Sequence, residues 1–138
     1  MVEYNSCLVV SRHKLLPLQE KDVESICKNV FITAELETDQ KKLFEHIKPY
    51  DVVIGSIPLQ LQIPIIQSGK ALITFVMKSI GTVENKEDAE AIAMRYPERA
   101  TILTSSKEGE KYRVVMYEGL KLIKEIKVID EWIVQHPS

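Results

Sequence analysis

The fold class of this chain can be inferred from residues Tyr50 to Lys78, YDVVIGSIPLQLQIPIIQSGKALITFVMK. An apolar run at 51–54 stops at the turn residues Gly55-Ser56-Ile57-Pro58, and a second apolar run follows Ser68-Gly69. Short apolar runs bounded by turn residues are typical of strands buried on both faces, and such strands are parallel when a helix connects them. The stretch therefore predicts a strand at 51–54, a helix at 61–68 that ends at Gly69, and a strand at 71–77.

The same patterns extend the prediction to both ends of the chain. Upstream, they predict strands at 6–11 and 30–34, a helix at 17–28 with Pro17 in its first turn, and a helix at 40–47 capped by Thr38 or Asp39. Downstream, they predict a helix capped by Asn85 and closed by Pro97, a strand at 101–104, and strands at 112–117 and 120–129. Glu118-Gly119, between the last two strands, reads as a two-residue hairpin turn.

The order of these elements predicts one Rossmann-like α/β domain over residues 1–138, with a βαβαβαβ core of three layers at 1–104. Because crossovers between parallel strands are right-handed, the first three helices should cover the faces of a mainly parallel sheet. The expected order of its strands, numbered along the chain, is 2-1-3-4. Residues 105–138 are predicted to form an antiparallel C-terminal β extension that lengthens one edge or makes a flap.

Composition narrows the class of protein. The chain has 138 residues, 45% of them apolar, and a formal charge of −2, which suits one compact domain and does not favour binding to duplex nucleic acid or an anionic membrane. No apolar run approaches the roughly 20 residues that span a bilayer, and the N-terminus lacks the pattern of a signal peptide. We therefore expect a soluble cytoplasmic protein. Many Ile and Lys residues with few Gly suggest a thermophile.

Two cysteines fall in predicted buried elements, Cys7 in a strand and Cys27 in a helix. Two isolated thiols do not make a metal site, so we expect inert core cysteines that stay reduced in the cytosol. The three histidines are scattered without Cys/His spacing. The sequence predicts no metal site and no cofactor.

A candidate ligand site follows from the topology, because ligands of such sheets bind beyond the carboxyl ends of the strands where the strand order reverses. Here that point lies between the first and third strands, which end at Ser11-Arg12-His13-Lys14 and at Gly55-Ser56-Ile57-Pro58. The end of the second strand adds Glu35, and the end of the fourth adds Lys78. Arg12 offers a bidentate fork for an anion, His13 a donor or general acid, and Gly55 a close approach to the backbone. The candidate ligand-binding residues are Ser11, Gly55, Ser56 and Gln60, and the candidate catalytic residues are His13, Arg12 and Lys78.

A plainer interpretation stays open. Gly55 and Pro58 can simply build a turn, and Arg12 and His13 can be solvated loop residues, because Gly-Ser-x-Pro is neither a Walker loop nor a dinucleotide-binding fingerprint.

The run Ser11-Arg12-His13-Lys14-Leu15-Leu16-Pro17-Leu18-Gln19 resembles the opening of small CRISPR-associated proteins with a CARF-like, Rossmann-type fold, and residues 51–56 resemble their later strand and turn. Leu16 stands where that opening usually has Thr. The resemblance implies a sensor of cyclic oligoadenylate, or a metal-independent ring nuclease that degrades it. In the nuclease, the ribose 2′-hydroxyl would attack its own phosphate, Arg12 or Lys78 would stabilise the phosphorane, and His13 would protonate the leaving oxygen.

Three functions follow as hypotheses. The first is a domain that binds a small anionic nucleotide-type ligand and acts as a homodimer, because a symmetric ligand calls for two-fold symmetry. The second is a non-catalytic, dimeric interaction protein. Its segment 120–132 would be an exposed strand edge in a monomer and would be covered in a dimer. The third is a small transferase or hydrolase that uses the same crevice.

Overall fold

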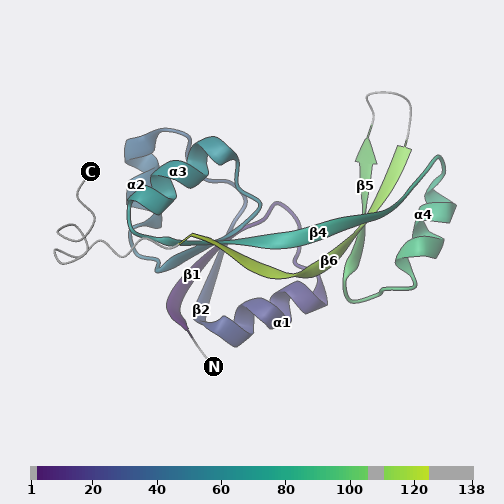
Figure 1. Ribbon diagram of the computed structural model, residues 1–138, viewed down its shortest axis with the longest axis horizontal. Helices are drawn as coiled ribbons and strands as arrows, with labels where there is room; N and C mark the ends of the chain where they lie inside the picture. The colour runs from purple at the N-terminus through teal and green to yellow at the C-terminus, as the bar shows by residue number, and fades with distance from the viewer. Residues whose placement is uncertain (1–2, 106–110, 125–138) are drawn as a thin grey trace.

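The computed structural model describes residues 3–105 and 111–124. Four helices and six strands alternate along this part of the chain (Figure 1). The strands are β1 (Tyr4–Val10), β2 (Cys27–Thr33), β3 (Val52–Gly55), β4 (Ala71–Val83), β5 (Ala100–Ser105) and β6 (Lys111–Lys124). The helices are α1 (Pro17–Ile26), α2 (Gln40–Ile47), α3 (Leu59–Gln67) and α4 (Lys86–Ala93).

The six strands form one mixed sheet in the order β2-β1-β3-β4-β6-β5. Strands β2, β1, β3 and β4 pair in parallel, while β6 is antiparallel to both β4 and β5. The α/β class and the parallel order 2-1-3-4 are thereby confirmed. Order reverses between β1 and β3, where Val10 lies opposite Gly55.

Two apolar clusters hold the helices on the two faces of the parallel part. On one face, Val23 of α1 packs with Cys7, Val9 and Ile54 of the sheet. On the other, α2 and α3 pack through their apolar positions against the alternate residues of the same strands, namely Leu8, Val53 and Leu72. Side chains of successive strand residues point to opposite faces, so a fully apolar strand such as β3 can fill both clusters.

Local sequence explains where the helices begin and end. The side chain of Asp39 accepts a hydrogen bond from Lys42 N at 3.2 Å, and that of Asn85 accepts one from Asp88 N at 2.9 Å. Both are the expected N-caps. Gly69 follows α3 with a φ of 87°, the left-handed conformation expected there. Helix α3 begins at Leu59, earlier than predicted, and keeps Pro64 inside it.

The hairpin predicted at Glu118-Gly119 is wrong, because both residues lie inside one continuous strand, β6. Tyr117 pairs with Met77 and Gly119 with Val76, which leaves Glu118 as an extra residue in a β-bulge. Gly119 has a φ of 147°, so the glycine that suggested a turn serves the bulge. The predicted end of a strand at Met77 is also wrong, since β4 continues to Val83.

The long strands β4 and β6 give the molecule its shape. They run together from the helix-covered part of the sheet to a second region that carries β5 and α4 (Figure 1). The antiparallel extension is therefore made of β5 and β6 with the far half of β4. Positions 106–110 and 125–138, including the rest of the predicted strand 120–129, Trp132 and His136, lie outside the described residues.

The expectation of unpaired cysteines is wrong. Cys7 and Cys27 are both buried, as predicted, but they form a disulfide that joins β1 to the start of β2. Cysteines spaced by 20 residues give no sign of pairing in the sequence, whereas the side-by-side parallel strands bring their Cα atoms to 6.0 Å, a distance that a disulfide spans. The cytoplasmic location stays a prediction. None of the helices among the described residues is long and apolar enough to cross a membrane.

Candidate functional site

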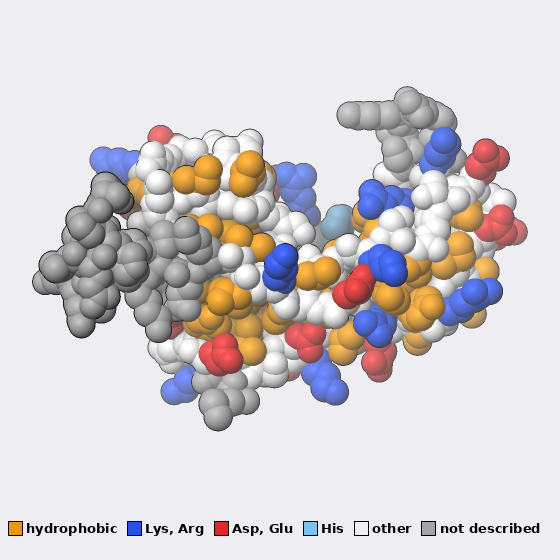
Figure 2. Space-filling view, viewed as in Figure 1, with side chains coloured by type: hydrophobic (Ala, Val, Ile, Leu, Met, Phe, Trp, Pro, Cys, Tyr) orange, Lys and Arg blue, Asp and Glu red, His pale blue; other side chains and the backbone are white. Residues whose placement is uncertain are grey.

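A cleft of about 720 Å³ lies beyond the carboxyl ends of the parallel strands, at the predicted point where strand order reverses. In Figure 2 the molecule is hollowed between the part that carries α2 and α3 and the part that carries β5 and α4. One wall is made by the loops that follow β1, β2 and β3. The other is made by the extension, through residues of β4, β5 and β6.

The loop after β1 brings Ser11, Arg12, His13 and Lys14 to the cleft. The amide of Ser11 donates to the carbonyl of Thr33 at 2.9 Å, which ties this loop to the end of β2. The hydroxyl of Ser11 donates to the carbonyl of His13 at 2.6 Å and accepts from its amide at 3.3 Å. Ser11 therefore shapes the loop that presents Arg12 and His13, in addition to its predicted contact with a ligand.

Gly55 ends β3 and directs the chain into the cleft. Its φ is 149°, and a Cβ atom at this position would lie 2.5 Å from the carbonyl oxygen of Val10. Glycine is needed because β1 and β3 approach closely here. Gly55 is buried and is not among the lining residues, whereas Ser56, Ile57 and Pro58 after it are. What the structure shows for Gly55 is a backbone role, and its predicted contact with a ligand stays a prediction.

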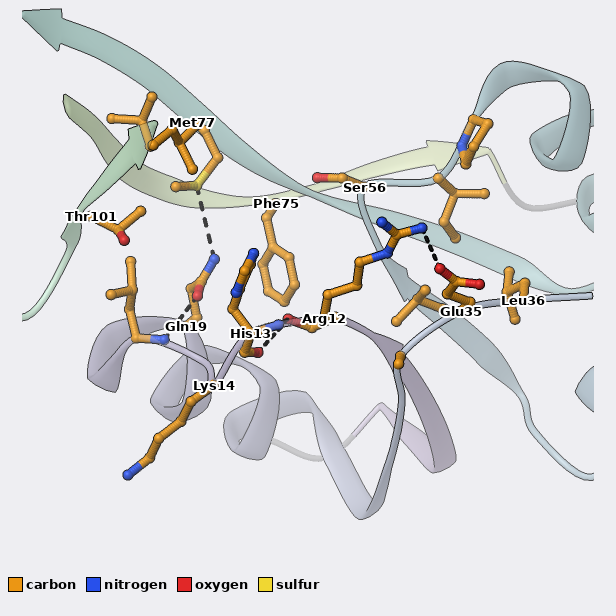
Figure 3. Close-up of a pocket in the computed structure, with 18 of the residues that line it drawn as sticks. Arg12, His13, Lys14, Gln19, Glu35, Leu36, Ser56, Phe75, Met77 and Thr101 are labelled. Carbon is orange, nitrogen blue, oxygen red and sulfur yellow. Dashed lines mark hydrogen bonds and ion pairs between the residues drawn. The ribbon is translucent and has the colours of Figure 1, made fainter. Parts of the chain in front are cut away.

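Arg12 and Glu35, which both line the cleft, form an ion pair (Figure 3). Their side chains are 72% and 63% exposed. An ion pair so open to water contributes little stability and can exchange partners with a ligand. The guanidinium of Arg12 thus stays open to solvent within the cleft.

The opposite wall adds residues that the sequence did not single out. Arg113 and Val115 on β6 pair with Leu103 and Thr101 on β5, and all four line the cleft. Arg113 is exposed and supplies a second guanidinium. It lies 101 positions after Arg12 in the chain, and only the pairing of β6 with β4 and β5 shows that the two share a cavity.

Gln19 is a buried polar residue at the base of the cleft, 8% exposed. Its Oε1 accepts from Leu16 N at 2.9 Å, and its Nε2 donates to the sulfur of Met77 at 3.8 Å. A leucine side chain cannot cap a helix, so Gln19 supplies a side-chain contact at the start of α1 instead. It also links α1 to β4 under the cleft.

Two predicted residues are not brought to the cleft. Lys78 pairs with Met116 within the long ladder of β4 and β6, so its side chain shares the face opposite to that of Val115. The prediction for Lys78 assumes that β4 ends at Met77, which it does not. Gln60 is exposed on α3 and is not a lining residue. The neighbouring Gln62 donates to the carbonyl of Ile57 at 2.7 Å.

The lining combines charge with apolar surface. Among the described residues its charged members are Arg12, Lys14, Arg113 and Glu35, an excess of cations in a chain whose formal charge is −2. Figure 3 shows the side chain of Lys14 pointing away from the other labelled residues, while Arg12, His13 and Phe75 point toward the same space. In the described part of the chain, no group of three or more His, Cys, Asp or Glu side chains could hold a metal ion.

Comparison with known proteins gives no relative: no protein-family profile, curated protein or solved structure matches this chain.

Proposed function

We propose that this protein binds a small anionic ligand of the nucleotide type in the cleft between the loops after β1 and β3 and the β5–β6 extension. The observation that carries the proposal is the placement of Arg12 and Arg113 on opposite walls of one cavity in a chain that is acidic overall. Guanidinium groups bind phosphate oxygens in a fixed, bidentate geometry. The sheet is taken to be Rossmann-like, a fold in which this position is the usual ligand site.

The apolar lining favours a nucleotide over a bare phosphate. Phe75, Met77 and Leu103 contribute to the same cavity as the two arginines. Ligand pockets are commonly mostly apolar with a few polar groups that fix orientation, and 720 Å³ lies within their usual range of about 300–1,000 Å³. A base would contact the apolar wall while its phosphate lies between the arginines.

Binding can be measured by thermal shift and calorimetry with a panel of mononucleotides, cyclic oligoadenylates and inorganic phosphate. We expect at least one nucleotide to raise Tm, and Arg12→Ala and Arg113→Ala to weaken its binding about tenfold or more. Arg95→Ala is the matched control, because Arg95 is exposed and is not a lining residue. Binding unchanged in both cleft variants, or lost equally in Arg95→Ala, would contradict the site.

A catalytic version of this function draws on the resemblance to CARF-like CRISPR-associated proteins. The observation that favours it is the imidazole of His13 in the same cavity as Arg12 and Ser56. In a ribonucleotide chain, the 2′-hydroxyl would lose its proton to solvent water and attack the adjacent phosphorus, and the bond to the 5′-oxygen would break. His13 would protonate that oxygen, Arg12 would stabilise the phosphorane, and the product would carry a 2′,3′-cyclic phosphate.

The test is incubation with cyclic oligoadenylate in the presence of EDTA, followed by product analysis. We expect linear products that His13→Ala no longer forms, although the variant still binds the ligand. Binding without cleavage by the unaltered protein would favour a sensor.

The alternative is a non-catalytic homodimer. Leu122 and Ile123 are 49% and 38% exposed. They lie on the part of β6 that pairs with β4 on one side and with no described strand on the other. An unpaired strand edge of this kind is prone to association. Light scattering over a range of concentrations would give the mass. A dimer dispersed by Leu122→Lys, in a protein that binds no nucleotide, would favour this interpretation.

A further inference from the structure

We propose that Glu35 selects ligands that carry a hydroxyl beside the phosphate, and hence that the cleft prefers ribonucleotides with a 3′-phosphate over their 2′-deoxy analogues. This inference rests on the proposed binding of a nucleotide-type anion and names its chemical class. The starting observation is that, among the described residues that line the cleft, Glu35 is the single carboxylate, and the other charged ones are cations.

The backbone holds Glu35 in place. It lies two residues beyond the end of β2, and the hydroxyl of Thr33 donates to its carbonyl at 3.2 Å. The next residue, Leu36, is buried in the cluster formed with α2 and α3. Ser11, at the start of the neighbouring loop, is hydrogen-bonded to Thr33. The carboxylate of Glu35 and the guanidinium of Arg12 are therefore set beside each other by strand pairing.

A carboxylate in this position has a chemical consequence. An anion that binds Arg12 comes close to Glu35, which repels it because both groups are negatively charged. An ionised carboxylate can only accept hydrogen bonds, so it cannot donate one to the anion. The repulsion is offset when the ligand offers a donor next to its negative charge. A ribose 3′-phosphate has such a donor, since its 2′-hydroxyl is on the adjacent carbon. A deoxyribose phosphate and inorganic pyrophosphate have none in that position.

A ligand that lacks the hydroxyl brings its phosphate beside the carboxylate with no donor to offset the repulsion. We therefore expect adenosine 3′-monophosphate to bind at least about tenfold more tightly than its 2′-deoxy analogue. Glu35→Gln removes the charge and keeps the shape. In this variant the ratio of the two affinities, ribonucleotide over 2′-deoxy analogue, should fall toward one. The deoxy compound should bind as well as before or better, since the repulsion is gone.

The experiment is calorimetric titration of both compounds, and of inorganic pyrophosphate, into the wild type and two variants. The control is Glu37→Gln, which makes the same change of charge two residues away at an exposed position outside the cleft lining. In Glu37→Gln, the affinity for adenosine 3′-monophosphate relative to its 2′-deoxy analogue should equal that of the wild type.

Equal affinities in the wild type, a ratio unchanged in Glu35→Gln, or the same fall in Glu37→Gln would overturn the role of Glu35 while nucleotide binding itself stands. Absence of binding by both compounds, with no effect of Arg12→Ala on any ligand, would overturn the proposed function together with this inference.

Discussion

At the scale of single residues, Gly55 shows how one position can serve both the sheet and the cleft. It lets β1 and β3 approach closely, and the chain that follows carries Ser56 into the cavity. Gly119 has nearly the same φ, 147° against 149°, but a Cβ atom there would have no neighbour within 4 Å. A side chain at either position would strain the backbone, but only one at Gly55 would also clash with a neighbour. Comparing substitutions at the two positions therefore separates the two effects.

Gly55→Ala is expected to destabilise the protein more than Gly119→Ala does. Strain alone costs about 1–3 kcal/mol at such a φ, and at Gly55 the contact with the Val10 backbone adds to it. Urea unfolding followed by circular dichroism would measure both losses. Equal losses would mean that the β1–β3 pair adjusts without cost.

Tyr117 is a second residue whose role only the tertiary structure reveals. Its ring is fully buried against Phe75, and its hydroxyl donates to Asp22 Oδ2 at 2.8 Å. Burial, then the hydrogen bond and charge of Asp22, raise the pKa of Tyr117 well above its usual value. The folded protein therefore holds this proton more tightly than the unfolded chain does.

The stability that Tyr117 contributes should be present below about pH 10, the usual pKa of tyrosine, and should fall as the pH rises above it. The unfolded chain then releases the proton while the folded state keeps it, so the free energy of unfolding drops by up to about 1.4 kcal/mol per pH unit. Tyr117→Phe should lose about 1 kcal/mol at neutral pH and show a shallower decline above pH 10. Identical slopes for the two proteins in alkaline urea titrations would argue against this account.

At the scale of elements, the disulfide joins the two strands whose ends carry Arg12 and Glu35. It closes a loop of about 20 residues that contains α1. Its reduction should lower the free energy of unfolding by about 3 kcal/mol, by the entropy of the opened chain. Unfolding curves with and without reductant, with thiol alkylation and mass spectrometry as the check, would test this. A thiol count of two in the untreated protein would contradict the bond itself.

The bulge in β6 is the other decisive element-scale feature. A turn at Glu118-Gly119 would have made two short strands, whereas the bulge keeps one strand of 14 residues that reaches from the core to the cleft wall. Because β6 continues past the bulge, Arg113 lines the same cavity as Arg12. A two-residue sequence signal cannot distinguish these outcomes, since glycine with positive φ suits both.

At the scale of the whole molecule, the cleft is a region of positive charge on an acidic protein. Binding of a nucleotide should therefore weaken as ionic strength rises, roughly tenfold between about 0.05 and 0.5 M salt, because solvent-exposed charges are screened. The affinity for the uncharged nucleoside should change little over the same range, which makes it the control. Equal salt dependence for nucleoside and nucleotide would show that the arginines do not contact the phosphate.

Sequence patterns were enough to predict the α/β class, the order of the four parallel strands and the caps at Asp39 and Asn85. They also predicted that the Arg12-His13 loop, Glu35 and Ser56 lie at one crevice. These follow from local patterns and from the handedness of crossovers, which are properties of neighbouring residues. Only the three-dimensional arrangement shows that Cys7 bonds Cys27, that β4 continues past Met77 and β6 runs through the expected turn, that Lys78 faces away, and that Arg113 lines the cleft. Each of these depends on which strands pair and in what register. The sequence pattern of one segment does not reveal which distant segment it pairs with.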